Sequence, residues 1–351
     1  MSKPVALLDP QWRRLDELFA QSDLDELGRL CDLVWAKQEP MPESLRREAL
    51  TNATFYLSSL PIVDVSQLES AMKLRAVIEL YGAFPDTVDY PACFARGVDV
   101  LATGPGMRRS VAEMAVAMAL SGARGLVQEH ELFRLGKEHW LNDNPQTDFS
   151  LYGQSIGFVG FGSIAKECCR LLAPFEPSVS VYDPWLDGKV ADEFGIKMVS
   201  LEELAQTSRC FFVTAAPTKT NKGVVSKAII DALPHAALLV LVSRAHVIDF
   251  DALVAAAGEG RIRAAIDVFP LEPLPENHPL RSMPNVILSP HRAAAVSGGR
   301  QLMGQLVLED IKLMIAGKEP ANLERARPEH VGDLAGVQHS KELEEMADER
   351  E

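Results

Sequence analysis

Short, unbroken apolar runs recur between residues 155 and 290, and stretches with helical spacing separate them. Apolar side chains at consecutive positions are typical of parallel strands that are buried on both faces of a sheet. The pattern predicts strands at 155–160, 178–183, 210–215, 237–242, 264–269 and 285–290. It predicts helices at 163–173, 200–206, 226–232 and 249–258. This part of the chain is therefore expected to alternate strands with helices around a parallel sheet.

The first hundred residues show the same alternation in a less regular form. The runs VALLD (5–9), ATFYLS (53–58) and LRAVIEL (74–80) predict strands, and the amphipathic stretches 11–30 and 43–50 predict helices. These elements indicate a separate α/β domain that precedes the one at 155–290.

A long apolar helix is expected to connect the two domains. Ser110 can act as its N-cap, and Glu113 lies three residues later, as in a capping box. The stretch up to Trp140 is richer in Ala, Met and Leu than one helix face needs, which suggests packing between domains or against a second subunit. A last helix is expected around 293–316, and the charged residues 325–351 are expected to form a flexible tail.

Composition narrows the classes of function without identifying one. The 351 residues are 47% hydrophobic and 24% charged, which is ordinary for about two globular domains. A net charge of −14 argues against a nucleic-acid or anionic-membrane partner but leaves a small anionic substrate possible. The five cysteines form no C-x-x-C pair and no zinc pattern, so no metal is expected. The start of the chain has no secretory h-region, and we expect a cytoplasmic protein.

A glycine-rich turn joins the predicted strand at 155–160 to the next helix. The sequence Gly160-Phe-Gly162-Ser-Ile-Ala165 has the G-x-G-x-x-G/A form of a dinucleotide-binding turn. Gly160 permits the tight turn, Gly162 allows a pyrophosphate to approach the backbone, and Ala165 permits close packing of helix against strand. The helix N-terminus would then offer N–H groups to the phosphates.

Asp183 ends the next predicted strand and bears on the choice of cofactor. A carboxylate at this place can accept hydrogen bonds from the ribose hydroxyls and would repel a 2′-phosphate. No Arg follows at 184–188, so the sequence favours NAD over NADP, although a solvated Asp at a strand end is the simpler alternative.

Three chemically matched residues follow the glycine turn in order. They are Arg244 in VSRAH, Glu272 in DVFPLE and His291 in SPH. A guanidinium can hold a carboxylate through two hydrogen bonds, and an imidazole can move a proton near neutral pH. A carboxylate beside that imidazole favours its protonated form. Together they suit hydride transfer to a 2-oxo acid.

Over roughly residues 74–315 the chain resembles the D-isomer-specific 2-hydroxyacid dehydrogenase family. The matching stretches are GVDVLATGPGMRRSVAE (97–113), YGQSIGFVGFGSIA (152–165), VYDP (181–184), VSRAHVID (242–249), AAIDVFPLEPLPENHPL (264–280) and PNVILSPH (284–291). The resemblance implies an α/β fold of two Rossmann-like, doubly wound parallel-sheet domains, with the nucleotide domain inserted into the substrate domain. Residues 1–106 and 292–324 would form the substrate domain, and residues 107–291 the NAD-binding domain. It also implies a homodimer.

The resemblance implies a role for each matching residue. Arg244 would bind the substrate carboxylate, His291 would act as general acid/base, and Glu272 would pair with His291. Asp267 would accept a hydrogen bond from the nicotinamide carboxamide, although a turn cap is an alternative role. The residues implied in cofactor binding are Gly160, Gly162, Ser163, Ile164, Asp183, Ala216, Pro217, Val242, Ser243 and Asp267. Those implied in substrate binding are Gly82, Ala83, Phe84, Arg108, Arg109 and Arg244.

The chain departs from the family pattern in the loop that would hold the substrate. The family has G-x-G-x-D/N there, whereas this loop reads Gly82-Ala-Phe84-Pro85-Asp86. Phe84 replaces the second glycine and Pro85 has no N–H, so we expect an altered or narrower pocket.

Smaller departures surround the other motifs. Leu241 and His246 stand where the family often has Asn and Gly, and Pro217 is shifted within its loop. Arg108, Arg109 and Arg292 suggest a second anionic group on the substrate, unless they contact cofactor phosphates, helix ends or solvent.

These features predict an NAD-dependent oxidoreductase that interconverts a 2-oxo acid and a D-2-hydroxy acid. Two alternatives share the fold: a phosphite-type dehydrogenase, and a non-catalytic NAD(H)-sensing protein of the corepressor branch. Fold alone does not separate them, because function belongs to the site.

Overall fold

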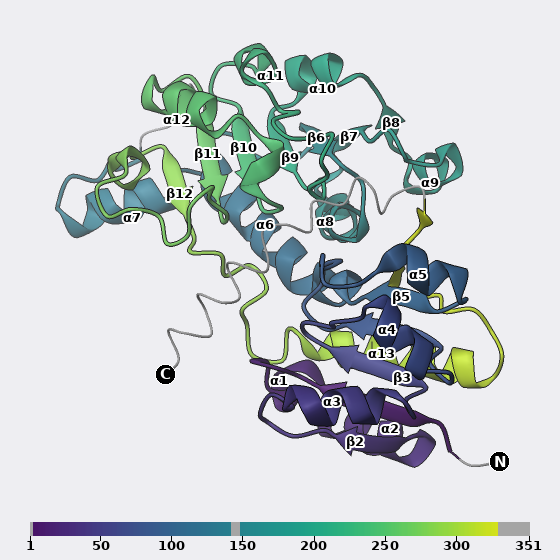
Figure 1. The fold of residues 1–351 in the computed structure, drawn as a ribbon. Coiled ribbons are helices and arrows are strands. Elements are labelled where there is room, and N and C mark those ends of the chain that lie inside the picture. Colours follow the sequence, from purple (N-terminus) through teal and green to yellow (C-terminus); the bar gives the residue numbers. More distant parts are fainter. Residues whose placement is uncertain (1–2, 142–147, 329–351) are drawn as a thin grey trace. The chain divides into compact units, whose positions relative to one another are not determined.

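The computed structural model describes residues 3–141 and 148–328 of the chain, which divides into two compact units. Unit 1 is formed by residues up to Met107 together with those from Val296 onward, and unit 2 runs from Arg108 to Ala295. Figure 1 shows each unit as a sheet covered by helices, and the sheets are parallel except for one edge strand of unit 1. Unit 2 is therefore a continuous stretch of chain inserted between the two segments of unit 1.

Unit 2 contains a seven-stranded sheet, among its described residues, in which every pair of neighbours is parallel. The strand order is β12-β11-β10-β9-β6-β7-β8. The strands are β6 (Ser155–Val159), β7 (Ser178–Tyr182), β8 (Lys197–Met198), β9 (Cys210–Val213), β10 (Leu238–Leu241), β11 (Arg263–Ile266) and β12 (Val286–Leu288). The helices are α6 (Arg108–Ala123), α7 (Leu126–Arg134), α8 (Ser163–Leu172), α9 (Gly188–Phe194), α10 (Leu201–Thr207), α11 (Lys227–Ala232) and α12 (Phe250–Gly258), with short 3₁₀ turns η2 (Ala173–Phe175), η3 (Ala245–Val247) and η4 (Pro279–Ser282).

Alternating side chains of these strands enter cores on opposite faces of the sheet. In β10, Leu239 and Leu241 join the core that α10, α11 and α12 complete. On the other face, α6 lies so close that a Cβ at Gly122 would come within 2.7 Å of Leu238. Burial on both faces explains why the central strands appear in the sequence as unbroken apolar runs.

Unit 1 contains a six-stranded sheet, again among its described residues, in the order β13-β5-β4-β3-β1-β2. Its strands are β1 (Val5–Asp9), β2 (Asp32–Trp35), β3 (Phe55–Ser58), β4 (Ala76–Glu79), β5 (Asp99–Ala102) and the antiparallel edge strand β13 (Glu324–Arg325). Its helices are α1 (Leu15–Leu18), α2 (Gln21–Leu30), α3 (Glu43–Leu50), α4 (Val65–Ser70), α5 (Tyr90–Ala95) and α13 (Gln301–Ile315), with the 3₁₀ turn η1 (Gly104–Met107). Helices α1, α2 and α13 complete the core on one face, and α3, α4 and α5 complete the core on the other.

The structure confirms the fold class and the predicted strands, and it corrects several element boundaries. Ser110 is not an N-cap: α6 begins at Arg108, because the 3₁₀ turn η1 runs directly into it. The long apolar stretch is two helices, since Gly125 adopts a left-handed φ of 60° between α6 and α7. The last helix begins at Gln301 rather than at 293, and the stretch 11–30 is divided into α1 and α2 by the extended residues Phe19 and Ala20.

The first residues of the predicted tail belong to the fold of unit 1. Arg325 belongs to β13, and the N–H of Ala326 donates to the carbonyl of Val100. Ala326 is buried in the core of unit 1, which explains why the chain stays ordered at this point. The rest of the tail, from residue 329, lies outside the described residues.

Within the described part of the chain, no single helix combines the length and apolar character needed to cross a bilayer. The segments Gly104–Ala123 and Leu126–Arg134 reach that length and apolar character only when they are taken together, and the pair is bent by 62°.

Candidate active site

The glycine turn of unit 2 has the geometry that its sequence predicted. Gly160 has a left-handed φ of 83°, and a Cβ at this position would lie 2.5 Å from the Cα of Ala215. The Gly160 N–H donates to the carbonyl of Tyr182, and its own carbonyl accepts from the Thr214 hydroxyl. Only glycine suits this position, because both the backbone conformation and the neighbouring strand exclude a side chain.

Helix α8 begins at this turn with the features of a phosphate-binding helix. Gly162 is its N-cap and provides no side-chain cap, so the first N–H groups of the helix keep their donor capacity for a ligand. A Cβ at Gly162 would meet no described atom within 4 Å, whereas Ala165, in the first turn of the helix, is completely buried. Ser163 and Ile164 occupy the first turn and are half-buried. An anionic group can thus approach the backbone here.

The carboxylate of Asp183 lies at the end of β7, beside this turn. One oxygen accepts from the N–H of Phe161 at 2.8 Å, and the other accepts from the N–H of Trp185 at 3.0 Å. Asp183 therefore fixes the middle of the glycine turn and places a negative charge next to it. Its use in ribose recognition and in the rejection of a 2′-phosphate stays a prediction.

A second group of cofactor-binding candidates follows β9 and β10. Val242 and Ser243 are buried, and the hydroxyl of Ser243 has no hydrogen-bond partner among the described residues. A buried hydroxyl without a partner is costly, and a bound polar group beside it would remove that cost. Together with the glycine turn, this hydroxyl fits a dinucleotide.

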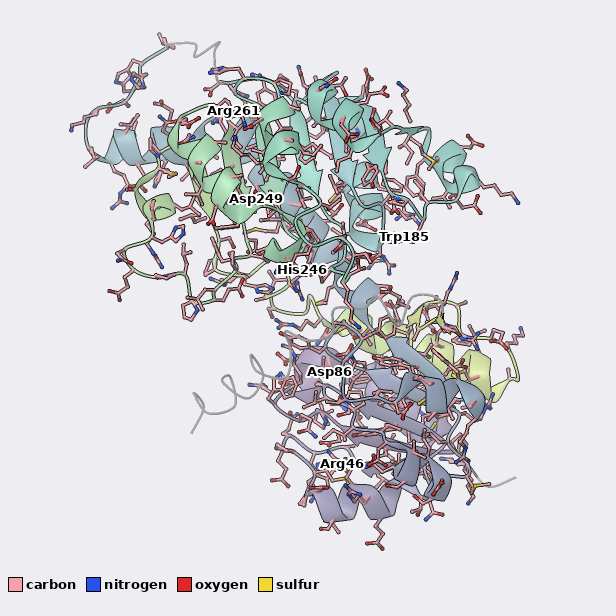
Figure 2. All side chains as sticks on the ribbon, turned by 45° about the horizontal axis from the view of Figure 1, so that its top comes forward. Arg46, Asp86, Trp185, His246, Asp249 and Arg261 are labelled. Carbon is pink, nitrogen blue, oxygen red and sulfur yellow. The ribbon has the colours of Figure 1, made fainter. Side chains whose placement is uncertain are left out.

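His246 orders the loop that carries Ala216 and Pro217, a role that sequence reasoning missed. Its Nε2 lies 2.8 Å from the carbonyl oxygen of Thr218, and the Asn221 side chain binds the Thr218 N–H and the Ala216 carbonyl. Figure 2 shows His246 and Trp185 at the same edge of unit 2, toward which the carboxyl ends of its strands point. The unusual histidine in VSRAH was the only signal in the sequence for this contact.

Glu272 and His291 are brought together on the loops that follow β11 and β12. Nδ1 of His291 lies 2.6 Å from Oε2 of Glu272, while Oε1 of Glu272 accepts from the N–H of Phe269 at 2.8 Å. The His291 side chain is 40% exposed, so its other ring nitrogen can meet a ligand. This is the contact that the resemblance implied; its catalytic use stays a prediction.

The electrostatic setting keeps Glu272 ionised. Burial works to raise the pKa of its carboxyl, but the hydrogen bond and charge of His291 act in the other direction, as do the Phe269 N–H and the charge of Arg244. Their sum holds the Glu272 pKa below its ordinary value of 4.5. A carboxylate in this state stabilises a positive charge on the neighbouring imidazole.

This lowered pKa predicts a pH-dependent contribution to stability. A group whose pKa is depressed in the folded protein stabilises it above the unfolded-state pKa, and that contribution is lost as the pH falls through the folded value. We expect Glu272→Gln to lower the free energy of unfolding by roughly 1 kcal/mol near pH 6, and by progressively less below about pH 4.5. Urea unfolding of both proteins across this range measures the difference.

The control is Glu276→Gln, which removes an exposed carboxylate from the same segment and should shift stability little at any pH. A constant difference between wild type and Glu272→Gln down to acidic pH would contradict the assignment.

Arg244 lies three residues after the end of β10, in an extended backbone conformation. Its Nη1 donates to the carbonyl of Ser243 at 2.8 Å, which holds one edge of the guanidinium against the strand end. Its charge acts on Glu272, so the cation belongs to the same local group as the Glu272–His291 pair.

Asp267 holds the turn that carries His291. The carboxylate of this fully buried residue accepts from the Ser289 hydroxyl and from the N–H groups of Arg292 and Ala293, at 2.9 and 3.1 Å. Its carbonyl accepts from the His291 N–H at 2.8 Å. The turn-cap role considered for Asp267 is therefore the one its contacts describe, whereas the contact with a nicotinamide stays a prediction.

The three arginines expected to recognise a second anion lie in different settings. Arg108 has its Nε 3.8 Å from Glu167 of α8, so its charge is already partly balanced. Arg109 and Arg292 are exposed. No described contact draws the three together.

The loop expected to bind substrate belongs to unit 1 and differs from the expectation. Phe84 is 8% exposed and is packed in the core beside Tyr90, and its use in substrate binding stays a prediction. The buried carboxyl group of Glu79 accepts from the N–H groups of Tyr81, Gly82 and Ala83. The N–H groups of Gly82 and Ala83, which the resemblance assigned to the substrate, are thus already bound within the protein. Phe84 faces inward because it is the apolar residue beneath this turn.

Comparisons with known proteins bear on this geometry. The model of the "D-isomer specific 2-hydroxyacid dehydrogenase, NAD binding domain" matches residues 116–293, which is half of the chain and contains Arg244, Glu272 and His291. A glyoxylate reductase from Thermofilum pendens is 30% identical over 317 residues, covering 87% of this chain and 92% of that protein. The chain belongs to the D-isomer-specific 2-hydroxyacid dehydrogenase family. It is accordingly an NAD-dependent oxidoreductase that acts on 2-oxo or 2-hydroxy acids.

Other members of the 2-hydroxyacid dehydrogenase family are similarly close. A D-3-phosphoglycerate dehydrogenase from Archaeoglobus fulgidus is 28% identical over 84% of this chain and 58% of its own length. The crystal structure of a phosphoglycerate oxidoreductase from Rhizobium etli matches with a TM-score of 0.82 and 34% identity, covering 93% of this chain and 99% of that one.

Proposed function

We propose that this 2-hydroxyacid dehydrogenase interconverts a 2-oxo acid and a D-2-hydroxy acid with His291 as the general acid/base. The observation that carries the proposal is the 2.6 Å contact between His291 and an ionised Glu272. Arg244, whose charge reaches the same pair, binds the substrate carboxylate through its guanidinium.

In the direction of reduction, NADH held at the glycine turn and Ser243 would supply the hydride that C2 of the substrate receives. His291 donates a proton to the carbonyl oxygen, so that the 2-oxo acid gains one hydride and one proton and becomes the alcohol. In oxidation, His291 takes the hydroxyl proton back. Glu272 fixes the orientation of the ring and stabilises its charged form, while Asp267 holds the turn on which the ring is mounted.

The test is NADH absorbance with a panel of 2-oxo acids, namely glyoxylate, pyruvate, hydroxypyruvate, oxaloacetate, phenylpyruvate and a phosphorylated 2-oxo acid. The named relatives support including glyoxylate and the phosphorylated compound. We expect at least one of them to oxidise NADH and to give the D-hydroxy acid on chiral analysis, with NADPH used less well because of Asp183. Tight binding of NADH without turnover of any member would contradict the proposal.

We also propose that the protein is a homodimer that associates through α7. This helix and the residues after it carry large exposed apolar side chains, including Leu126, Phe133, Leu135 and Trp140, which are 60%, 59%, 66% and 70% exposed. Several large apolar side chains exposed along one helix are typical of a protein–protein interface.

Replacement of Leu126 and Phe133 together by Asp should convert the dimer to a monomer, because two buried charges would oppose association. Light scattering coupled to size-exclusion chromatography measures the mass. The matched control is Leu45→Asp, on an apolar residue of α3 that is 45% exposed, which should leave the mass unchanged. A wild-type protein that is monomeric at micromolar concentration would refute the proposal.

A further inference from the structure

Two arginines from distant parts of the sequence meet in unit 1, beside the loop that follows β4. Arg13 follows β1, and Arg300 is the N-cap of α13. Their side chains are only 14% and 19% exposed, and both approach the same carboxylate, that of Glu17. Both N–O distances are 3.5 Å, which is at the outer limit of a hydrogen bond.

The donors of this pair are incompletely used. The Nε atoms of Arg13 and Arg300 are both buried, and neither has a hydrogen-bond partner among the residues that the structure describes. Glu17 also accepts from the N–H of Arg14, so its oxygens serve three donors. Burying a cation with unmatched donors is unfavourable unless a further acceptor is available.

The local charge is positive. Two guanidinium groups face the single carboxylate of Glu17, and burial, followed by the charge of Arg13, lowers the pKa of Arg300. Glu79 adds little negative charge near neutrality, because burial raises its pKa to about 8 against the pull of its three N–H donors and of Arg13. One positive charge is therefore left without a counter-charge in this group.

The pair adjoins the loop that the family uses for substrate. The guanidinium carbon of Arg13 lies 4.9 Å from the centre of the Tyr81 ring, and the Trp12 ring meets the Tyr81 ring edge-on with 5.9 Å between ring centres. The strands β1 and β4 are parallel members of one sheet, so Arg13 and Tyr81 follow their carboxyl ends at the same edge. Ligands of open α/β sheets bind at this edge.

We propose that Arg13 and Arg300 form an anion-binding subsite of unit 1 for a phosphate or carboxylate group of the substrate. Two planar guanidinium groups suit the oxygens of either group. Because Glu79 already binds the N–H groups of Gly82 and Ala83, anion recognition at this edge is transferred from the backbone to these side chains. The inference rests on the proposed function, since it specifies the substrate of the same reaction.

The first measurement is independent of turnover. Inorganic phosphate is titrated into the protein by calorimetry at low ionic strength, with wild type compared with Arg13→Gln and Arg300→Gln. Each substitution should weaken phosphate binding about ten- to hundred-fold, since each removes a charge-assisted contact. The control is Arg47→Gln, which removes the same charge from an exposed pair on α3 of unit 1 and should leave binding unchanged.

The second measurement compares substrates by kinetics. Pyruvate represents monoanions, a phosphorylated 2-oxo acid represents the phosphate arm, and oxaloacetate the carboxylate arm. Each substitution should raise the KM of the preferred dianionic substrate by at least ten-fold. The KM of pyruvate should change by less than about two-fold. Whether the enzyme prefers the phosphorylated 2-oxo acid or oxaloacetate shows whether the subsite binds a phosphate or a carboxylate.

The outcomes separate this inference from the proposed function. Unchanged phosphate binding in both variants, or equal losses for mono- and dianionic substrates, would overturn the subsite. Loss of phosphate binding in a protein that turns over no 2-oxo acid would support the subsite and reject the reaction. If the Gln variants fail to fold, Arg13→Lys and Arg300→Lys keep the charge and should show a smaller loss, because an ammonium lacks the planar fork.

Discussion

Replacing His291 with Asn should lower kcat by about 10²- to 10⁴-fold, because the reaction loses its proton donor while the fold of the turn is kept. Asn is the informative substitution since His291 has a left-handed φ of 49°, a conformation that Asn tolerates and Ala does not adopt without strain. The Asn amide can also remain near Glu272. Steady-state kinetics with the best substrate of the panel gives the loss, and NADH fluorescence should show cofactor binding close to that of wild type.

The matched control is His235→Asn, which changes an exposed histidine of unit 2 and should leave kcat unaffected. Comparison with His291→Ala adds a test of the backbone: Ala should lose the same activity and also some stability. If His291→Asn kept activity within ten-fold of wild type, another group would have to supply the proton.

The second large effect is expected at Arg244. Arg244→Lys should lower kcat/KM by roughly 10²-fold, because an ammonium cannot reproduce two parallel hydrogen bonds to a carboxylate, and Arg244→Ala should lose more. The Ser243 carbonyl holds one nitrogen of the guanidinium, so the planar group is oriented before substrate arrives. A lysine would lose this orientation as well as the second donor.

Guanidinium rescue distinguishes a direct role from a structural one. Added guanidinium ion should restore part of the activity of Arg244→Ala, while it should not restore that of His291→Asn. An Arg244→Lys enzyme with wild-type kcat/KM would mean that the substrate carboxylate is held elsewhere.

The central strands and the motifs of unit 2 could be predicted because each depends on local sequence. In β9 and β10 every residue is buried, so the apolar run alone defines the strand. Gly160 is required by its own backbone angle and by Ala215 opposite, and such glycines occur in a recognisable spacing. Arg244, Glu272 and His291 lie within 50 residues of one another on loops after adjacent strands of one sheet.

The elements that were missed depend on tertiary contacts. Strand β2 is half-exposed and its apolar run is only four residues long, and β13 pairs with the edge of the sheet that β5 offers. The resemblance implies a substrate-binding role for Phe84 because its position within a motif is visible in the sequence, whereas its burial is not. The contact of Arg300 with Glu17 spans 283 residues, and the capture of three N–H groups by Glu79 requires a buried strand end. No local pattern signals either arrangement.

The insertion of unit 2 into unit 1 has a consequence for synthesis on the ribosome. Unit 2 is one uninterrupted stretch, so it can fold as soon as Ala295 has emerged. Unit 1 cannot, because α13 supplies Met303, Val307, Ile311 and Met314 to its core and β13 completes its sheet edge. The face of the nascent sheet that α13 will cover therefore stays open to solvent while nearly 190 intervening residues are translated. Chaperones should therefore bind nascent chains of this protein mainly at that face.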